Sequence, residues 1–246
     1  MWMLLHGFMG SERSWDSLIT MGRFDDTPRR PRLLGHGDDW RSRRVSTFEE
    51  EVARLVDEAG SMPSPRFLCG YSMGARVALG ALAAGGVDFA GAVLVGVHPG
   101  LETRAERAER RQVDAARIGQ IREEGLGAFV DAWESDPLFA SQQGLAGAKL
   151  SVQRDVRVGH DPAGLVTSLE VLGLAEMPSY ADTLRSHSNL LLVAGALDDK
   201  FVSIARRAGT PRAPVFVEGA GHNVVLEAPG AIVETMEAVE CNHARD

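Results

Sequence analysis

A serine flanked by glycines, Ser72, has the surroundings in this chain that most clearly indicate catalysis. It is the centre of Gly70-Tyr71-Ser72-Met73-Gly74, which lies between a short apolar run and an amphipathic run. A G-x-S-x-G sequence at a strand-to-helix turn lifts the serine oxygen above the sheet, because the glycines tolerate the sharp turn. The helix that begins there directs its free N–H groups towards an oxyanion formed beside the serine. The pattern therefore predicts a nucleophile elbow.

Two further polar residues follow apolar runs later in the chain and complete a catalytic set. Asp198 comes after the run 189–195, and His222 lies in a glycine-rich turn after the run 214–217. A serine hydroxyl needs an imidazole to take its proton, and the imidazole needs a carboxylate to fix its tautomer. Asp199 is the alternative acid, but Asp198 comes first after the strand, whereas Asp199 suits a helix cap. The order Ser, Asp, His is that of the α/β-hydrolases.

The composition excludes several classes of protein. The 246 residues are 44% hydrophobic and 24% charged, which suits one large globular domain with an insertion. The net charge of −8 argues against nucleic-acid or anionic-membrane partners, and no apolar run approaches the roughly 20 residues of a membrane helix. Cys69 and Cys241 make no disulfide framework, and the first residues lack the basic segment of a signal peptide. We expect a cytoplasmic monomer or weak homo-oligomer without cofactor or metal.

Short apolar runs alternate with helical patterns, which predicts an α/β fold on a mostly parallel sheet of about six strands. The strands are expected at 2–5, 31–34, 66–69, 91–96, 189–195 and 213–217, and helices at 48–59, 73–83, 201–207 and 231–239. Residues 99–188 contain no convincing strand, and helical stretches run through them at 102–121, 126–133 and 162–172. We expect this segment to form a helical cap over a core made of residues 1–98 and 189–246.

His6-Gly7-Phe8 follows the first expected strand and resembles the His-Gly oxyanion loop of α/β-hydrolases. That loop normally follows two further strands, so the sheet is expected to lack its first two edge strands. The resemblance implies that the backbone N–H groups of Phe8 and Met73 form the oxyanion hole. His36, in a glycine-rich turn, is interpreted as a loop-structuring histidine, because no carboxylate is placed obviously to orient it.

Several motifs beyond the triad resemble one family of this superfamily, the 2-succinyl-6-hydroxy-2,4-cyclohexadiene-1-carboxylate (SHCHC) synthases of menaquinone biosynthesis. The similarity runs from about residue 6 to residue 229. The matching segments are 70–78 with its arginine four residues after the serine, 97–111, Trp133 with 137–139, Arg157 with 162–165, and 220–223 with 227–229.

The resemblance implies a lyase that removes pyruvate from an enolpyruvyl ether without adding water. The substrate, 2-succinyl-5-enolpyruvyl-6-hydroxy-3-cyclohexene-1-carboxylate, carries several carboxylates, and a guanidinium can bind a carboxylate through two parallel hydrogen bonds. The expected binding residues are Tyr71, Arg76, Arg110, Trp133 and Arg157. The resemblance also implies that the serine acts as a base that removes a proton next to the succinyl carbonyl.

Alternatives stay open for these residues and for the reaction. Glu106 stands four residues before Arg110, the favoured order for an ion pair on a solvated helix, and Arg154 is a close rival of Arg157. The sequence alone does not distinguish a serine base from a serine nucleophile. The main alternative function is therefore a carboxylester or carbon–carbon bond hydrolase with the same triad. A catalytically silent binding protein is disfavoured, since no triad member is missing.

Overall fold

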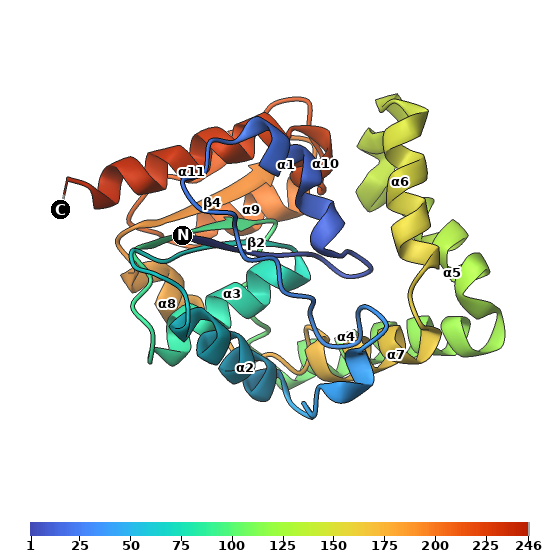
Figure 1. The fold of residues 1–246 in the computed structure, drawn as a ribbon. Coiled ribbons are helices and arrows are strands. Elements are labelled where there is room, and N and C mark those ends of the chain that lie inside the picture. The colour runs from blue at the N-terminus through green and yellow to red at the C-terminus, as the bar shows by residue number, and fades with distance from the viewer. Residues whose placement is uncertain (246) are drawn as a thin grey trace.

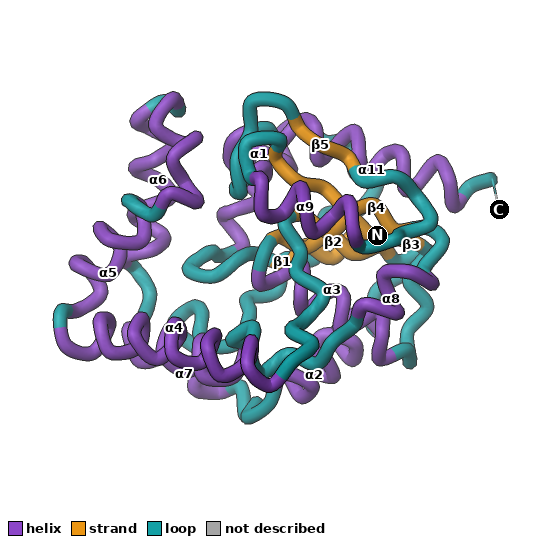
Figure 2. The backbone as a smooth tube through the Cα atoms, turned by 180° about the vertical axis from the view of Figure 1, so that it is seen from behind, coloured by secondary structure: helices purple, strands orange, loops and turns teal. Residues whose placement is uncertain are grey.

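A parallel β-sheet forms the centre of the chain, as Figures 1 and 2 show for the computed structural model, which describes residues 1–245. Within these residues the sheet has five strands in the order β1-β2-β3-β4-β5, and every neighbouring pair is parallel. Their bounds are Trp2–Leu5, Phe67–Tyr71, Gly91–Val95, Leu190–Gly195 and Val215–Val217. The strands are almost continuously apolar, because helices cover both faces of the sheet.

Successive strand residues alternate between two apolar cores. Leu68 and Leu94 face the core beneath α2, α3, α8 and α9, whereas Cys69 and Val95 face the core beneath α1, α10 and α11. The first set of helices spans Phe48–Gly60, Met73–Ala84, Ala181–Ser186 and Asp199–Arg207, and the second spans Asp16–Met21, Val224–Glu227 and Pro229–His243. Short 3₁₀ helices cover Glu12–Trp15, Trp40–Ser42 and Pro137–Gly144.

Within residues 1–245, five α-helices lie between β3 and β4. Besides α8 they are α4 (Arg104–Glu123), α5 (Gly125–Glu134), α6 (Gly147–Val158) and α7 (Pro162–Leu172). Helices α4, α5 and α7 share a third apolar cluster, which also includes Met9 from the loop after β1. In Figures 1 and 2, α5 and α6 stand beside the sheet and its helices. This arrangement favours our proposal that residues 99–188 are a cap on a core of residues 1–98 and 189–246.

The strand expected at 31–34 does not form, so the sheet has five strands rather than about six. Only Arg29 meets the sheet edge, where its N–H and C=O pair with Trp2 and Leu4 at 2.9 and 2.8 Å. The amides of Leu33 and Leu34 donate instead to side chains, His6 Nε2 and Glu51 Oε1. The N–H groups of this apolar run therefore bond to side chains and not to the backbone of a neighbouring strand.

Most other expected elements are present, and their ends differ from the expected ones by at most four residues. Helix α6 was not expected, and the sequence marks its start poorly, because no side chain caps its first turn. The short helices α1 and α8 were likewise not expected. None of the helices in residues 1–245 combines the length and the hydropathy needed to cross a membrane.

Candidate active site

Ser72 occupies the sharp turn between β2 and α3, where its backbone is held at φ 52° and ψ −108°. A non-glycine residue pays for a positive φ, and such strain is found where a side chain must be presented in one direction. The flanking glycines make the turn feasible. A Cβ on Gly70 would lie 2.6 Å from the Cα of Ala75, and one on Gly74 would lie 2.1 Å from the carbonyl oxygen of Leu5. The G-x-S-x-G pattern therefore reflects close backbone packing.

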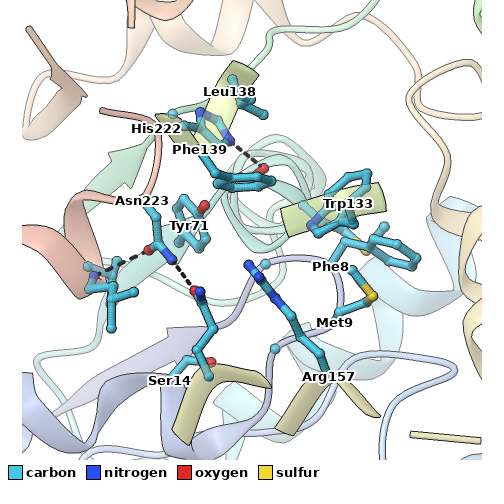
Figure 3. Close-up of a pocket in the computed structure, with 18 of the residues that line it drawn as sticks. Phe8, Met9, Ser14, Tyr71, Trp133, Leu138, Phe139, Arg157, His222 and Asn223 are labelled. Carbon is cyan, nitrogen blue, oxygen red and sulfur yellow. Dashed lines mark hydrogen bonds between the residues drawn. The ribbon is translucent and has the colours of Figure 1, made fainter. Parts of the chain in front are cut away.

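The imidazole of His222 lies between Ser72 and Asp198. Its Nε2 is 3.0 Å from the serine Oγ, and its Nδ1 is 2.8 Å from the Asp198 Oδ2. A dashed line in Figure 3 marks the hydrogen bond between the labelled His222 ring and the serine oxygen. Both His222 and Asp198 are buried, so their contact is shielded from water. This is the geometry in which a carboxylate orients an imidazole and the imidazole takes a serine proton.

The two neighbouring aspartates are clearly separated by the fold. Asp198 caps α9 by accepting a hydrogen bond from the N–H of Phe201 at 3.2 Å, and its other oxygen faces His222. Asp199 is exposed at the first position of the helix. The helix cap that the sequence suggested for Asp199 is thus formed by Asp198, which both caps α9 and contacts His222.

Two backbone amides border the serine at the positions expected for an oxyanion hole. The amide of Met73 is at the N-terminus of α3, and that of Phe8 is in the loop after β1. Within residues 1–245 neither N–H has a protein acceptor. Gly74 packs directly against the end of β1, which brings the two segments together. Both residues line one pocket with Ser72, so the amides are available to an anionic oxygen there.

Two buried histidines hold the loop that carries Phe8. His6 Nε2 accepts from the N–H of Leu33 at 3.2 Å, and His36 Nε2 accepts from the N–H of Met9 at 3.0 Å. Since each Nε2 is an acceptor, the proton of each neutral ring is on Nδ1, which donates to a backbone carbonyl. Burial lowers the pKa of His6 to about 4 and that of His36 well below its usual value. This position agrees with the loop-structuring role predicted for His36.

We expect this loop to make the protein sensitive to mild acid. A histidine that is neutral in the folded protein makes its full contribution to the free energy of unfolding above about pH 6.5. As the pH falls from there towards the folded pKa, only the unfolded chain binds a proton at this residue, so the folded state loses stability. Replacing His36 by glutamine keeps an acceptor and removes this titration. The loss of unfolding free energy between pH 7 and pH 5 should become smaller by about 2 kcal/mol. Urea denaturation at both pH values measures this, and an unchanged loss would contradict it.

The triad opens into a pocket of about 430 Å³ between the sheet and helices α4 to α6. Phe8, Tyr71, Trp133 and Phe139 form much of its wall, as Figure 3 shows. The Tyr71 ring also lies 5.4 Å from the ring of His222. The indole Nε1 of Trp133 is buried and has no hydrogen-bond partner within residues 1–245. An apolar pocket with a few unsatisfied polar groups is typical of a small-molecule site.

Arg76 lies one turn along α3 from Ser72 and is 7% exposed. Its Nη1 donates to the carbonyl of Leu172 at the end of α7 at 2.8 Å. Within residues 1–245 no carboxylate lies within 4 Å of its guanidinium. Burial, with the nearby charge of Arg110, lowers the pKa of Arg76 to about 9, so that the group stays charged at pH 7. Its charge is therefore available to an anionic ligand.

Arg110 lines the same pocket, and its partner differs from the one that spacing suggested. Its Nε donates to Asp114 Oδ2 at 2.8 Å. Glu106 instead accepts from the backbone N–H and the hydroxyl of Thr103 in a capping box at the start of α4. The Arg110–Glu106 ion pair, the alternative left open by the sequence, is not formed.

The rival arginines are three residues apart on α6, and only one of them lines the pocket. Arg157 is 5% exposed, lines the pocket, and lies over the ring of Phe139 at 5.3 Å. Arg154 is half-exposed and binds Asp131 and Glu134 at the surface of the cap. Glu134 also accepts from Arg157 at 3.1 Å. The geometry thus places Arg157, and not Arg154, at the pocket.

The pocket also contains polar residues to which the sequence assigned no role. They include His98, Arg117, Gln153, Lys200 and Asn223. The Nδ2 of Asn223 donates to Gln153 Oε1 at 3.1 Å, which joins the turn that carries His222 to α6, as Figure 3 shows. Adjacency to motif residues could have indicated Lys200 and Asn223. Nothing local could have indicated Gln153, because its helix was not expected.

Comparisons with known proteins agree with this architecture. The model of the alpha/beta hydrolase family matches residues 3–235. A 2-succinyl-6-hydroxy-2,4-cyclohexadiene-1-carboxylate synthase from Enterobacter sp. (strain 638) is 31% identical over 242 residues, covering 96% of this chain and 89% of that protein. A protein of the same name from Citrobacter koseri is 32% identical over 238 residues, covering 96% and 91%.

Solved structures have the same fold. MenH from S. aureus has a TM-score of 0.88 and 27% identity, and the match covers 99% of this chain and 94% of that one. A thermophilic esterase from Thermogutta terrifontis has a TM-score of 0.76 at 22% identity, covering 98% and 89%. The second likeness concerns the fold alone.

Proposed function

The chain belongs to the alpha/beta hydrolase family and, within it, to the SHCHC synthases. From this premise we propose that Ser72, His222 and Asp198 carry out its reaction. The enzyme is a carbon–oxygen lyase of menaquinone biosynthesis. It eliminates pyruvate from 2-succinyl-5-enolpyruvyl-6-hydroxy-3-cyclohexene-1-carboxylate to give SHCHC. A cytoplasmic location and a monomeric or weakly associated state remain predictions.

In the proposed mechanism, Ser72 is the base and His222 its proton relay. The imidazole Nε2, 3.0 Å from Oγ, takes the hydroxyl proton as the serine oxygen removes the proton next to the succinyl carbonyl. Asp198, 2.8 Å from Nδ1, stabilises the imidazolium that results. The electron pair of the broken C–H bond moves onto the carbonyl oxygen, where the amides of Phe8 and Met73 stabilise the enolate.

The second half of the reaction expels the leaving group. The enolate re-forms its carbonyl, and the electron pair shifts through the ring to break the bond between ring carbon and ether oxygen. Pyruvate leaves as its enolate and takes up a proton from the His222 imidazolium, which returns the triad to its starting state. The ring thereby gains a conjugated diene, and no water is consumed. The elimination needs no covalent bond between substrate and Ser72.

The observation that carries this proposal is the placement of arginines around the triad. Arg76 and Arg110 lie on one side of the pocket, and Arg157 comes from α6. A buried guanidinium is costly to leave unpaired, so such a pocket suits a ligand with several carboxylates. Tyr71 and Trp133 then bound the space for the ring of the substrate.

The direct test is incubation of the purified protein with the enolpyruvyl substrate. We expect one pyruvate for each new diene, with pyruvate measured by coupled lactate dehydrogenase and the diene by its ultraviolet absorbance. A boiled sample controls for spontaneous breakdown of the substrate. Equal rates in the native and boiled samples would contradict the assignment.

We expect Arg157→Ala to weaken transition-state binding by about 2–5 kcal/mol, because the substrate then loses a buried charged partner. Lysine at this position should restore activity only in part, since it lacks the two-pronged contact. Arg154→Ala is the matched control, because Arg154 shares Glu134 but lies outside the pocket. Steady-state kcat/KM for pyruvate release measures both, and equal losses in the two alanine variants would count against a binding role.

A further inference from the structure

Two guanidinium groups bind one carboxylate at the side of the pocket formed by α3, α4 and α7, and a third, that of Arg76, lies close enough to feel its charge. Asp114, which is 6% exposed, accepts from Arg110 at 2.8 Å and from Arg117 at 3.2 Å. It also lies against Gly173, next to the Leu172 carbonyl that binds Arg76. We call Arg76, Arg110, Asp114 and Arg117 the arginine–aspartate cluster.

The charges of this cluster do not balance. Three positive groups face one acid, and the C-terminal carbonyls of α7 supply only a partial negative charge to Arg76. Burial and the charge of Arg110 both lower the pKa of Arg117. Lys200 lines the same pocket and, within residues 1–245, has no carboxylate within 4 Å. The pocket is therefore over-supplied with positive charge until an anion binds.

Arg117 is the member of the cluster that also meets the aromatic wall. Its guanidinium lies 4.9 Å from the ring centre of Trp133, and both residues line the pocket. The buried indole Nε1 of Trp133 is one of the donors that lack a hydrogen-bond partner within residues 1–245. Both side chains thus line the same space, and a carboxylate bound there would meet the charged donor of Arg117 beside an indole whose N–H is unsatisfied.

The distance from the reacting centre suits a short acidic chain. Arg76 is one helical turn, about 5.4 Å, from Ser72 along α3, and Arg110 and Arg117 face the same side of the pocket. Two methylene groups separate the carbonyl and the carboxylate of a succinyl chain. A ketone held beside Ser72 would therefore place that carboxylate near the cluster.

We propose that Arg117 is a further substrate-binding residue, which together with the Trp133 indole binds the carboxylate at the end of the succinyl chain. The identity of this ligand rests on the proposed function. The subsite itself would recognise any aryl ketone whose short chain ends in a carboxylate.

A binding experiment tests this independently of turnover. The probes are 4-oxo-4-phenylbutanoate and its neutral amide, and calorimetry measures the dissociation constant of each. Wild-type protein should prefer the acid. Arg117→Gln should weaken acid binding at least 10-fold and change amide binding less than 2-fold, and Arg117→Lys should recover part of the preference. In turnover, Arg117→Gln should raise KM more than it lowers kcat.

Arg122→Gln is the matched control, because Arg122 forms another α4–α7 ion pair, with Glu170, outside the pocket. It should keep the wild-type preference, and melting temperatures of all variants verify folding. If Arg117→Gln weakens binding of the acid and of the amide equally, or leaves both unchanged, then Arg117 only supports Trp133 and the inference is wrong. If the wild type discriminates through Arg117 yet releases no pyruvate, the subsite stands and the lyase assignment fails.

Discussion

Replacing Ser72 by alanine should lower kcat for pyruvate release by roughly 10³-fold or more, because the variant lacks the oxygen that removes the substrate proton. Within residues 1–245 the Ser72 hydroxyl forms a hydrogen bond only with His222, so the fold should survive the change. Removing either other member should cost a comparable factor, since an imidazole without its carboxylate adopts the wrong tautomer. Steady-state kinetics on the enolpyruvyl substrate measure each loss.

The three residues should behave as one unit. A Ser72→Ala/His222→Ala double variant should be little slower than Ser72→Ala alone, because the relay has no purpose without the serine. The matched control for Asp198→Asn is Asp199→Asn, which changes an exposed neighbour outside the triad. That control should keep near-normal turnover. Full activity in Ser72→Ala would remove the serine from the mechanism.

Elimination of pyruvate should exceed hydrolysis of small neutral esters by several orders of magnitude in kcat/KM. A neutral ester leaves the buried guanidinium of Arg76 without a carboxylate and that of Arg157 with Glu134 alone, and this lack of an anionic partner opposes ester binding. Because the serine acts as a base, no acyl-enzyme should accumulate during natural turnover. Parallel assays with the enolpyruvyl substrate and p-nitrophenyl butyrate measure the ratio, and rapid mixing tests for a burst.

Either of two results would contradict the lyase mechanism. One is comparable turnover of p-nitrophenyl butyrate and the enolpyruvyl substrate, and the other is an adduct on Ser72 detected by mass spectrometry during natural turnover. The triad geometry suits acyl transfer as well, so a carboxylester or carbon–carbon bond hydrolase would then be the function that remains.

The sheet could be predicted where its signals were local. A strand buried on both faces must be apolar throughout, so β1, β3 and β4 were visible as short hydrophobic runs. The segment 31–34 has the same appearance but forms no strand. Its amides are satisfied by His6 and Glu51, which lie far from it in the chain. No local pattern reveals that such acceptors will be in reach.

The cap shows the same limit for charged residues. The spacing along α4 suggested that Arg110 pairs with Glu106. In the structure Glu106 forms the capping box at the start of the helix, and Arg110 pairs with Asp114 instead. The choice between Arg154 and Arg157 depended on which face of α6 meets the pocket. That face is set by packing against other helices, and the sequence suggested no helix there.

The sequence by itself determined the chemistry of the centre: a serine on a glycine-flanked turn, an acid and a histidine after later strands, and the family to which that order belongs. These features are local or depend on chain order, because a parallel sheet brings the carboxyl ends of its strands to one edge. Only the tertiary structure decided the charges around the substrate. Asp114 joins Arg110 to Arg117, and Trp133 is left with a free indole N–H. These contacts depend on how helices pack across the pocket, and side chains distant in sequence meet only when that packing is complete.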